Sequence, residues 1–203
     1  MERMINGVPY STMDQVTVKE NFKYHLAADA LKEVMKHFDY ENLQRIADII
    51  DGAKNVFVAG RGRSRQTAMN FGERLAQFGK SVYVVGMPTA PSIGKGDVLV
   101  LSSGSGSTPT LVDFAKTALA EGAKVVLFTA SRGAEVAKLG ADTFYVSDYN
   151  YQDDSGADRE IYQQIYAYYD YPTNLALETV LTYLMQKNGI TREQAEAEKP
   201  NLF

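Results

Sequence analysis

Asp97-Val-Leu-Val-Leu-Ser-Ser-Gly-Ser-Gly-Ser-Thr108 leads from an apolar run into a segment made only of Ser, Gly and Thr, and helical spacing of apolar residues begins at Pro109. This pattern predicts a buried strand, a tight polar turn and the first turn of a helix. Glycine lets the backbone approach a ligand closely, and a helix N-terminus presents unpaired N–H groups and a positive partial charge. The stretch therefore predicts a site for phosphate or another small dianion. The alternative is a Gly/Ser turn whose hydroxyls only cap the helix.

Four other short apolar runs occur along the chain, at residues 55–60, 82–86, 125–129 and 143–146. They are too short for helices, and strands covered on both faces of a sheet have this composition. Helical patterns lie between most of the runs, so we predict an α/β fold with a doubly wound parallel sheet. Ligands bind such sheets beyond the carboxyl ends of the strands, near the point where the strand order reverses.

The chain is predicted to form one domain over residues 1–203, since this length suffices for a full core. Residues 1–17 lack clear periodicity and are interpreted as an N-terminal arm. Residues 18–50 have helical spacing, with Asp39 as the N-cap of a second helix. Residues 190–203 suit a short exposed helix and a C-terminal tail.

A Tyr-rich insertion is predicted at residues 148–171, where Tyr, Asp and Gln dominate. We interpret it as an ordered contact, because tyrosine is amphipathic and common at interfaces. Such a contact could be a cover over the site or an oligomer contact, and a disordered insert is the alternative. Pro172 is predicted to start a helix that runs to about Lys187.

The composition narrows the classes of function. The net charge is −4 without a basic block, which argues against a nucleic-acid partner, and no apolar run approaches a membrane span. The chain has no Cys and two His, His25 and His37, so we expect neither disulfides nor a metal site. The lack of Cys and of an apolar signal core leads us to expect a cytoplasmic protein.

A second Gly-rich turn, Gly60-Arg-Gly-Arg-Ser-Arg65, follows the first strand. Arg65 replaces the third glycine of the dinucleotide pattern, no acidic residue ends the second strand, and the Gly-Lys-Ser/Thr of a Walker motif is absent. What remains is a turn that carries Ser64 among guanidinium groups, which suits phosphate. Ordinary solvated charge is the alternative for the three arginines.

Glu178 is the carboxylate best placed for a chemical role. It lies among apolar residues soon after Pro172, and such surroundings can raise the pKa of a carboxyl group toward the range useful for proton transfer. The alternative is a structural role as a favourable charge in the first turn of a helix. No Ser/His/Asp arrangement is discernible, so nucleophilic hydrolysis is not favoured.

These motifs resemble the sugar isomerase (SIS) domain family, and within it the 6-phospho-3-hexuloisomerases. The likeness rests on Gly60–Arg65, on Pro91-Ser-Ile-Gly-Lys-Gly-Asp97 and on Ser103–Thr108, which follow the family's Gly-Arg-Ser, Pro-x-Ile-x-x-Gly-Asp and Ser-Gly-Ser-Gly-x-Thr patterns. It covers about residues 43–146. The chain departs from the pattern at Ser107, where the family usually has Glu, at Arg65, and in the segment after Pro172.

The resemblance implies a flavodoxin-like fold with a five-stranded parallel sheet, assembled as a homodimer or homotetramer. It implies that the substrate is a sugar phosphate and that Glu178 is the catalytic base. The residues that it assigns to the substrate phosphate are Ser64, Ser103, Gly104, Ser105, Gly106, Ser107 and Thr108, with Gly62 and Arg63 at the edge of the site. The implied reaction interconverts D-arabino-hex-3-ulose 6-phosphate and fructose 6-phosphate through a cis-enediol(ate), without a metal or other cofactor.

Three other functions use similar phosphate turns. One is isomerisation of a different sugar phosphate, and a second is a non-catalytic phosphosugar sensor that acts through a protein partner. A third is a lyase or etherase for an amino-sugar phosphate. The role of Glu178 distinguishes an isomerase from a sensor, because an isomerase needs a carboxylate over the sugar and a sensor does not.

Overall fold

The computed structural model describes residues 4–5, 8–9, 31–32, 34–147, 169–199 and 201. The predictions for residues 148–168, for His25 and for most of the arm lie outside the described residues. Within the arm the structure describes β1 (Met4–Ile5) and β2 (Val8–Pro9), which pair antiparallel.

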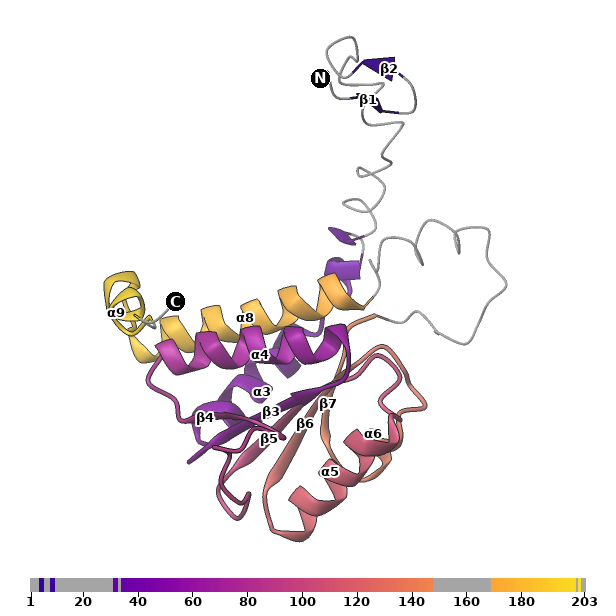
Figure 1. Ribbon diagram of the computed structural model, residues 1–203, viewed down its shortest axis with the longest axis vertical. Coiled ribbons are helices and arrows are strands. Elements are labelled where there is room, and N and C mark those ends of the chain that lie inside the picture. The colour runs from indigo at the N-terminus through magenta and orange to yellow at the C-terminus, as the bar shows by residue number, and fades with distance from the viewer. Residues whose placement is uncertain are drawn as a thin grey trace.

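A five-stranded sheet forms the centre of the molecule (Figure 1). Its strands are β3 (Val56–Gly60), β4 (Val82–Val84), β5 (Val98–Ser102), β6 (Lys124–Thr129) and β7 (Asp142–Tyr145). They lie in the order β4-β3-β5-β6-β7, and each neighbouring pair is parallel. The strand order reverses between β3 and β5, so the predicted doubly wound α/β fold is confirmed.

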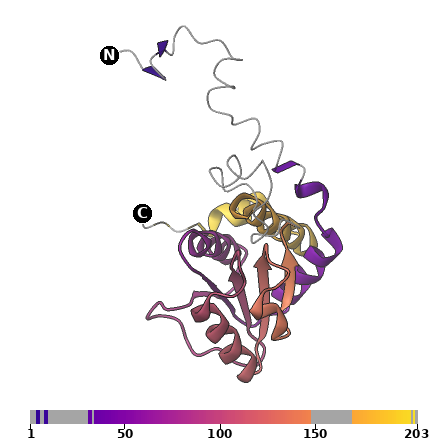
Figure 2. The ribbon, with the colours of Figure 1, turned by 90° about the vertical axis from the view of Figure 1, so that its right-hand side faces the viewer.

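Helices cover both faces of the sheet (Figures 1 and 2). On one face lie α3 (Tyr40–Asp51), α4 (Arg63–Gln77) and α8 (Asp170–Asn188), and on the other α5 (Pro109–Ala120) and α6 (Glu135–Lys138). Along β3, Val56 and Val58 point into the first core, whereas Phe57 and Ala59 point into the second. Because both sets are buried, each central strand is a continuous apolar run.

The structure agrees with two of the predictions about the helices and contradicts a third. Asp39 caps α3, since its Oδ1 accepts from the N–H of Asn42 at 2.9 Å, and this prediction is confirmed. A short helix, α9 (Arg192–Ala197), lies in the predicted C-terminal region. The prediction that Pro172 starts the preceding helix is wrong. α8 begins at Asp170, and Pro172 fits within its first turn, where the N–H that proline lacks needs no partner.

The connection from β4 to β5 contains no helix and is anchored by Asp97. Asp97 is buried, and its two carboxylate oxygens accept from the side chain of Asn55 at 2.8 Å and the N–H of Gly94 at 2.9 Å. This loop and α5 border an apolar cavity of about 420 Å³ that includes Phe57 and Leu99 in its lining. The lining also includes Met87, whose sulfur lies 3.8 Å from the guanidinium of Arg65 in the Gly-rich turn that follows β3.

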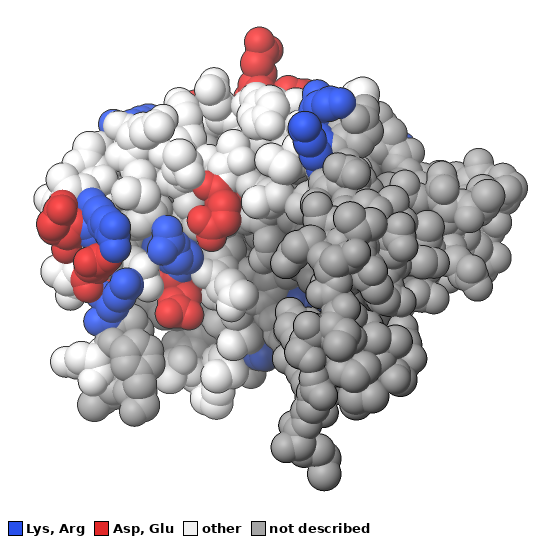
Figure 3. All heavy atoms as spheres, turned by 90° about the horizontal axis from the view of Figure 1, so that it is seen from above, with Lys and Arg blue, Asp and Glu red and all other residues white. Residues whose placement is uncertain are grey.

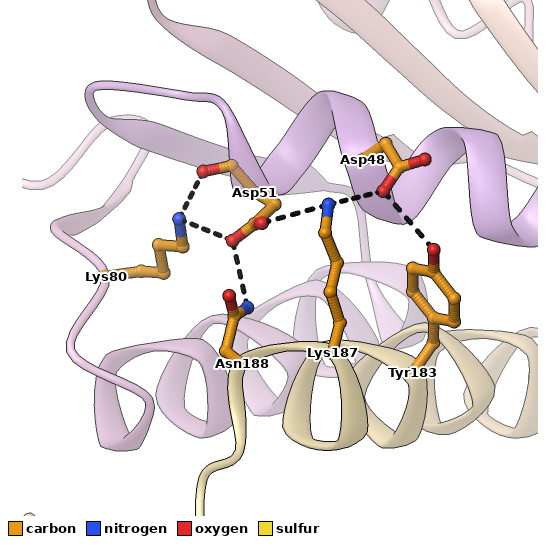
Figure 4. A network of polar contacts seen from close by, with 6 residues as sticks. All are labelled: Asp48, Asp51, Lys80, Tyr183, Lys187 and Asn188. Atoms are coloured by element: carbon orange, nitrogen blue, oxygen red, sulfur yellow. Dashed lines mark hydrogen bonds and ion pairs between the residues drawn. The ribbon is translucent and has the colours of Figure 1, made fainter.

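A network of charged side chains joins α3 to α8 (Figure 4). Lys187 contacts Asp48 at 2.6 Å and Asp51 at 3.2 Å. Asp51 also contacts Lys80 at 3.0 Å and accepts from Asn188 at 3.1 Å. Burial alone would raise the pKa of Asp51, but the hydrogen bonds and charges of Lys80, Lys187 and Asn188 outweigh it and lower that pKa.

We expect Asp51→Asn to lower the free energy of unfolding by about 1 kcal/mol near neutral pH. Because the pKa of Asp51 is lowered on folding, its contribution is complete above its ordinary value of 3.8 and is lost as the pH falls through the folded-state value. Urea unfolding of both proteins at several pH values measures this difference, which should shrink below about pH 4. A difference independent of pH would contradict the assignment. Asp113→Asn, on the exposed face of α5, is the control and should have no such effect.

Candidate functional site

The carboxyl ends of β3 and β5 lie side by side at one edge of the sheet. Gly60, the last residue of β3, is paired with Ser102, the last residue of β5. Each strand is followed by a Gly-rich turn and a helix. The two turns picked out in the sequence therefore meet where the strand order reverses, which is the usual ligand position in this architecture.

The first turn packs the start of α4 tightly against the end of β3. A Cβ atom on Gly60 would lie 2.5 Å from the carbonyl oxygen of Ser64, a distance that no side chain can occupy. Gly62 is the N-cap of α4, and its φ of 56° is in the left-handed region that favours glycine. These two glycines bring Ser64, in the first turn of α4, up to the edge of the sheet.

The second turn is held in shape by its own first residue. Ser103 is buried, and its Oγ accepts from the N–H of Gly106 at 3.1 Å. Gly106 has φ of 59°, and a Cβ atom there would overlap the Cβ of Ala134 at the start of α6. The turn is therefore narrow and passes close to the segment that follows β6.

The last residue of β6 and the segment after it support the second turn from its other side. Thr129 Oγ1 donates to the carbonyl oxygen of Gly104 at 3.0 Å. Ser107 Oγ donates to the carbonyl oxygen of Ser105 at 3.3 Å and accepts from the N–H of Glu135 at 3.0 Å. The hydroxyl proton of Ser107 is thus directed to the turn itself. The supporting role of Thr129 was missed in the sequence, where it stands out only as the end of a strand.

Several donors in the second turn have no partner within the described part of the chain. No hydrogen bond there uses the N–H of Gly104, Ser105 or Thr108. Thr108 is the N-cap of α5, yet its hydroxyl makes no capping hydrogen bond. This differs from Thr191, whose hydroxyl accepts from Gln194 N at the start of α9. The alternative in which the turn only caps its helix is therefore not supported at Thr108.

The three arginines of the first turn point to different surroundings. Arg63 Nε donates to Asp170 Oδ2 at 2.7 Å, which joins the first turns of α4 and α8. Arg65 lies against the sulfur of Met69, 3.2 Å from its guanidinium, and Arg61 is exposed. Arg63 is thus held at the start of α8, and its role at the edge of a substrate site stays a prediction.

Tyr169 is a central residue that the sequence did not single out. It immediately precedes α8 and is 8% exposed. Its hydroxyl lies 2.7 Å from Ser102 Oγ, and its ring lies 3.5 Å from the position that a Cβ on Gly104 would take. Tyr169 belongs to a run of several tyrosines, so composition alone could not distinguish it from its neighbours.

Glu178 is not brought to the two turns within a single chain. It lies in the third turn of α8 and is exposed, so the alternative role as a first-turn charge is also wrong. It stands eight positions after Asp170, which is about 12 Å along the helix axis. Its carboxylate has no hydrogen bond or ion pair within the described residues.

Charges of both signs gather near α9 on the face seen from above, whereas the middle of that face, over α4 and α8, is largely uncharged (Figure 3). Within the described residues, no three His, Asp or Glu side chains are grouped so that they could share a metal ion. The same part of the chain contains no helix both long and apolar enough to span a membrane.

The chain is similar to several known proteins. The SIS domain family model matches residues 49–150. An uncharacterized protein of Archaeoglobus fulgidus is 39% identical over 114 residues, which are 56% of this chain and 62% of that protein. A 3-hexulose-6-phosphate isomerase of Methylomonas aminofaciens is 32% identical over 158 residues, 78% of this chain and 86% of that enzyme. A crystal structure of a hypothetical protein has a TM-score of 0.79 at 31% identity, over 88% of this chain and 95% of the other. The matches thus span less than two thirds of the first relative and most of the other two.

Proposed function

The chain belongs to the SIS domain family, and from that we propose that it is a phosphosugar isomerase. The family resemblance drawn from the two Gly-rich turns and from Pro91–Asp97 is confirmed by the match over residues 49–150. The relative from Methylomonas aminofaciens, a 3-hexulose-6-phosphate isomerase, supports the same reaction class for this chain.

One observation carries the proposal, namely the unpaired donors of the second turn. The N–H groups of Gly104, Ser105 and Thr108 have no acceptor within the described residues, and the Thr108 hydroxyl is also unused. They stand at the N-terminus of α5, whose dipole favours an anion. Ser64 lies across the switch point on the first turn. Donors arranged in this way suit the oxygens of a phosphate group.

The phosphate group of the substrate lies far from the reacting carbons, so an anchor for it can assist an isomerase without taking part in the chemistry. Binding energy at the phosphate positions the sugar and can be used to reach the transition state. For a 3-ketose, a base removes the proton on C2, and the electrons form a C2–C3 enediolate with its charge on O3. Returning a proton to C3, while the hydroxyl proton passes from O2 to O3, gives the 2-ketose.

We propose Glu178 as that base and D-arabino-hex-3-ulose 6-phosphate and fructose 6-phosphate as the pair interconverted. Support for Glu178 comes from the resemblance alone, because it is the seventh residue of the segment that begins at Pro172, a segment that otherwise departs from the family pattern. Its exposure on α8 fits the homodimer or homotetramer that the resemblance implies, because a second copy can then cover this helix. Support for the sugar comes from the relative's name alone.

We expect Thr108→Ala to weaken the binding of fructose 6-phosphate by about 1–3 kcal/mol, since a hydrogen bond to a charged group is lost. The free energy of unfolding should stay close to that of the wild type, because Thr108 makes no capping bond. Titration calorimetry and urea unfolding measure the two quantities. Thr191→Ala is the matched control, which should lose about 0.5–2 kcal/mol of stability and keep its affinity. Unchanged affinity in Thr108→Ala would contradict the phosphate assignment.

A further inference from the structure

The hydroxyl of Tyr169 lies where β5, β6 and α8 meet. It donates to the carbonyl oxygen of Phe128 at 3.3 Å and, with its own proton so used, accepts from Ser102 Oγ at 2.7 Å. The N–H of Ser103 donates to the same Phe128 oxygen at 3.0 Å. Tyr169 and the first residue of the second turn therefore share one acceptor, and the position of each depends on the other.

The ring of Tyr169 packs directly against the second turn. Two of its carbons lie 3.5 Å from the point where a Cβ on Gly104 would stand, which is ordinary van der Waals contact. The carbonyl oxygen of Gly104 is held by Thr129. The backbone of Gly104, whose N–H is one of the unpaired donors, is thus fixed by a ring and by a hydrogen bond.

The residues that follow Tyr169 fasten it to the first turn. Asp170 pairs with Arg63 at 2.7 Å, and the side chain of Asn174 donates to Thr67 Oγ1 at 3.4 Å. Asn174 also donates to the carbonyl oxygen of Asp170 at 2.7 Å, which closes the start of α8. Tyr169 therefore stands between the two turns and is fixed to both.

The protonation state of Tyr169 determines what it can do. Burial raises its pKa well above the ordinary value of 10.0, and the side chains of Ser102 and Ser64 offset only part of that rise. The phenol therefore keeps its proton at physiological pH. It can hold hydroxyl and carbonyl groups in place, but it cannot act as a general base.

We propose that Tyr169 is a positioning residue for the phosphate site, which sets the separation of the Ser64 turn from the Ser103–Thr108 turn. This role rests on the proposed function. Tyr169 is the one buried tyrosine among those that the structure describes. It also gives the junction between the Tyr-rich insertion and α8 a part in substrate binding that the two Gly-rich motifs do not reveal.

Tyr169→Phe tests the proposal, because it keeps the ring on Gly104 and removes only the hydroxyl. We expect the affinity for inorganic phosphate and for fructose 6-phosphate to fall by about 3- to 10-fold, the size of one neutral hydrogen bond. KM for the isomerised sugar should rise by a similar factor and kcat should change less than twofold. Tyr171→Phe, at an exposed neighbour, is the control and should leave both constants unchanged.

Ser102→Ala removes the other hydroxyl of the pair and provides a second variant. The double variant should bind phosphate no more weakly than Tyr169→Phe alone, because the hydrogen bond between Ser102 and Tyr169 is already lost in that variant. Additive losses, or a Tyr169→Phe protein with wild-type affinity and KM, would overturn the proposal and leave the proposed function intact. A wild-type protein that binds neither ligand would overturn both. If Tyr169→Phe does not fold, the proposal depends on Ser102→Ala, and unchanged affinity there overturns it.

Discussion

Glu178→Gln is expected to lower turnover by about 10²- to 10⁴-fold, the usual contribution of a general base, while sugar-phosphate affinity stays unchanged. The structure makes this an unusually clean substitution. Glu178 is exposed, and its carboxylate has no hydrogen bond or ion pair within the described residues. Replacing it with the isosteric amide therefore breaks no contact that holds the fold. A purely structural role predicts no effect at all.

Turnover and fructose 6-phosphate affinity of this variant should be measured beside those of Glu73→Gln. Glu73 is another exposed carboxylate, on α4, and its substitution should change neither quantity. Full turnover in Glu178→Gln would show that the base lies elsewhere. Lost affinity together with lost turnover would show instead that Glu178 supports substrate binding.

Gly106→Ala should be strongly damaging although it adds only one heavy atom to the phosphate site. The new Cβ would overlap the buried Cβ of Ala134, and a non-glycine residue at φ of 59° is strained. We expect a loss of roughly 2–5 kcal/mol in the free energy of unfolding from strain and overpacking together. The turn must also move away from α6, so phosphate binding should be abolished even where the protein remains folded.

Gly189→Ala distinguishes the effect of backbone strain from the effect of overpacking. Gly189 has nearly the same φ, 62°, but no atom lies within 4 Å of the position that its Cβ would take. Its substitution should cost only the backbone strain, about 1–2 kcal/mol, and leave phosphate binding intact. Chemical unfolding and calorimetric titration of both variants provide the comparison. Equal destabilisation of the two would contradict the close packing at Gly106.

The sheet could be predicted from the sequence because its strands are buried on both faces. The apolar run after Asp97 was predicted to be a buried strand, and the other four strands were predicted to within two residues of their observed bounds. The start of α8 was predicted two residues too late, at Pro172. Its first residue, Asp170, pairs with Arg63, a contact between residues 107 positions apart that local pattern does not reveal.

The site was predictable to the extent that it depends on glycine and on helix N-termini. Gly60 and Gly106 are needed for close backbone approaches, and both stand in recognisable Ser/Gly or Arg/Gly turns. Tyr169 and Thr129 were not predictable, because they act through hydroxyl groups brought in from elements remote in the chain. The placement of Glu178 away from the turns likewise follows from how α8 packs, and not from its own neighbours in sequence.

Proton–deuterium exchange is the measurement that tests the isomerase directly. The protein is incubated in D₂O with fructose 6-phosphate and a small panel of other sugar phosphates, and the carbon-bound protons are followed by NMR. We expect protein-dependent loss of a proton next to the carbonyl carbon and the appearance of a 3-ketose, both absent with Glu178→Gln. Tight binding of a sugar phosphate without any exchange across the panel would contradict the isomerase and indicate a sensor.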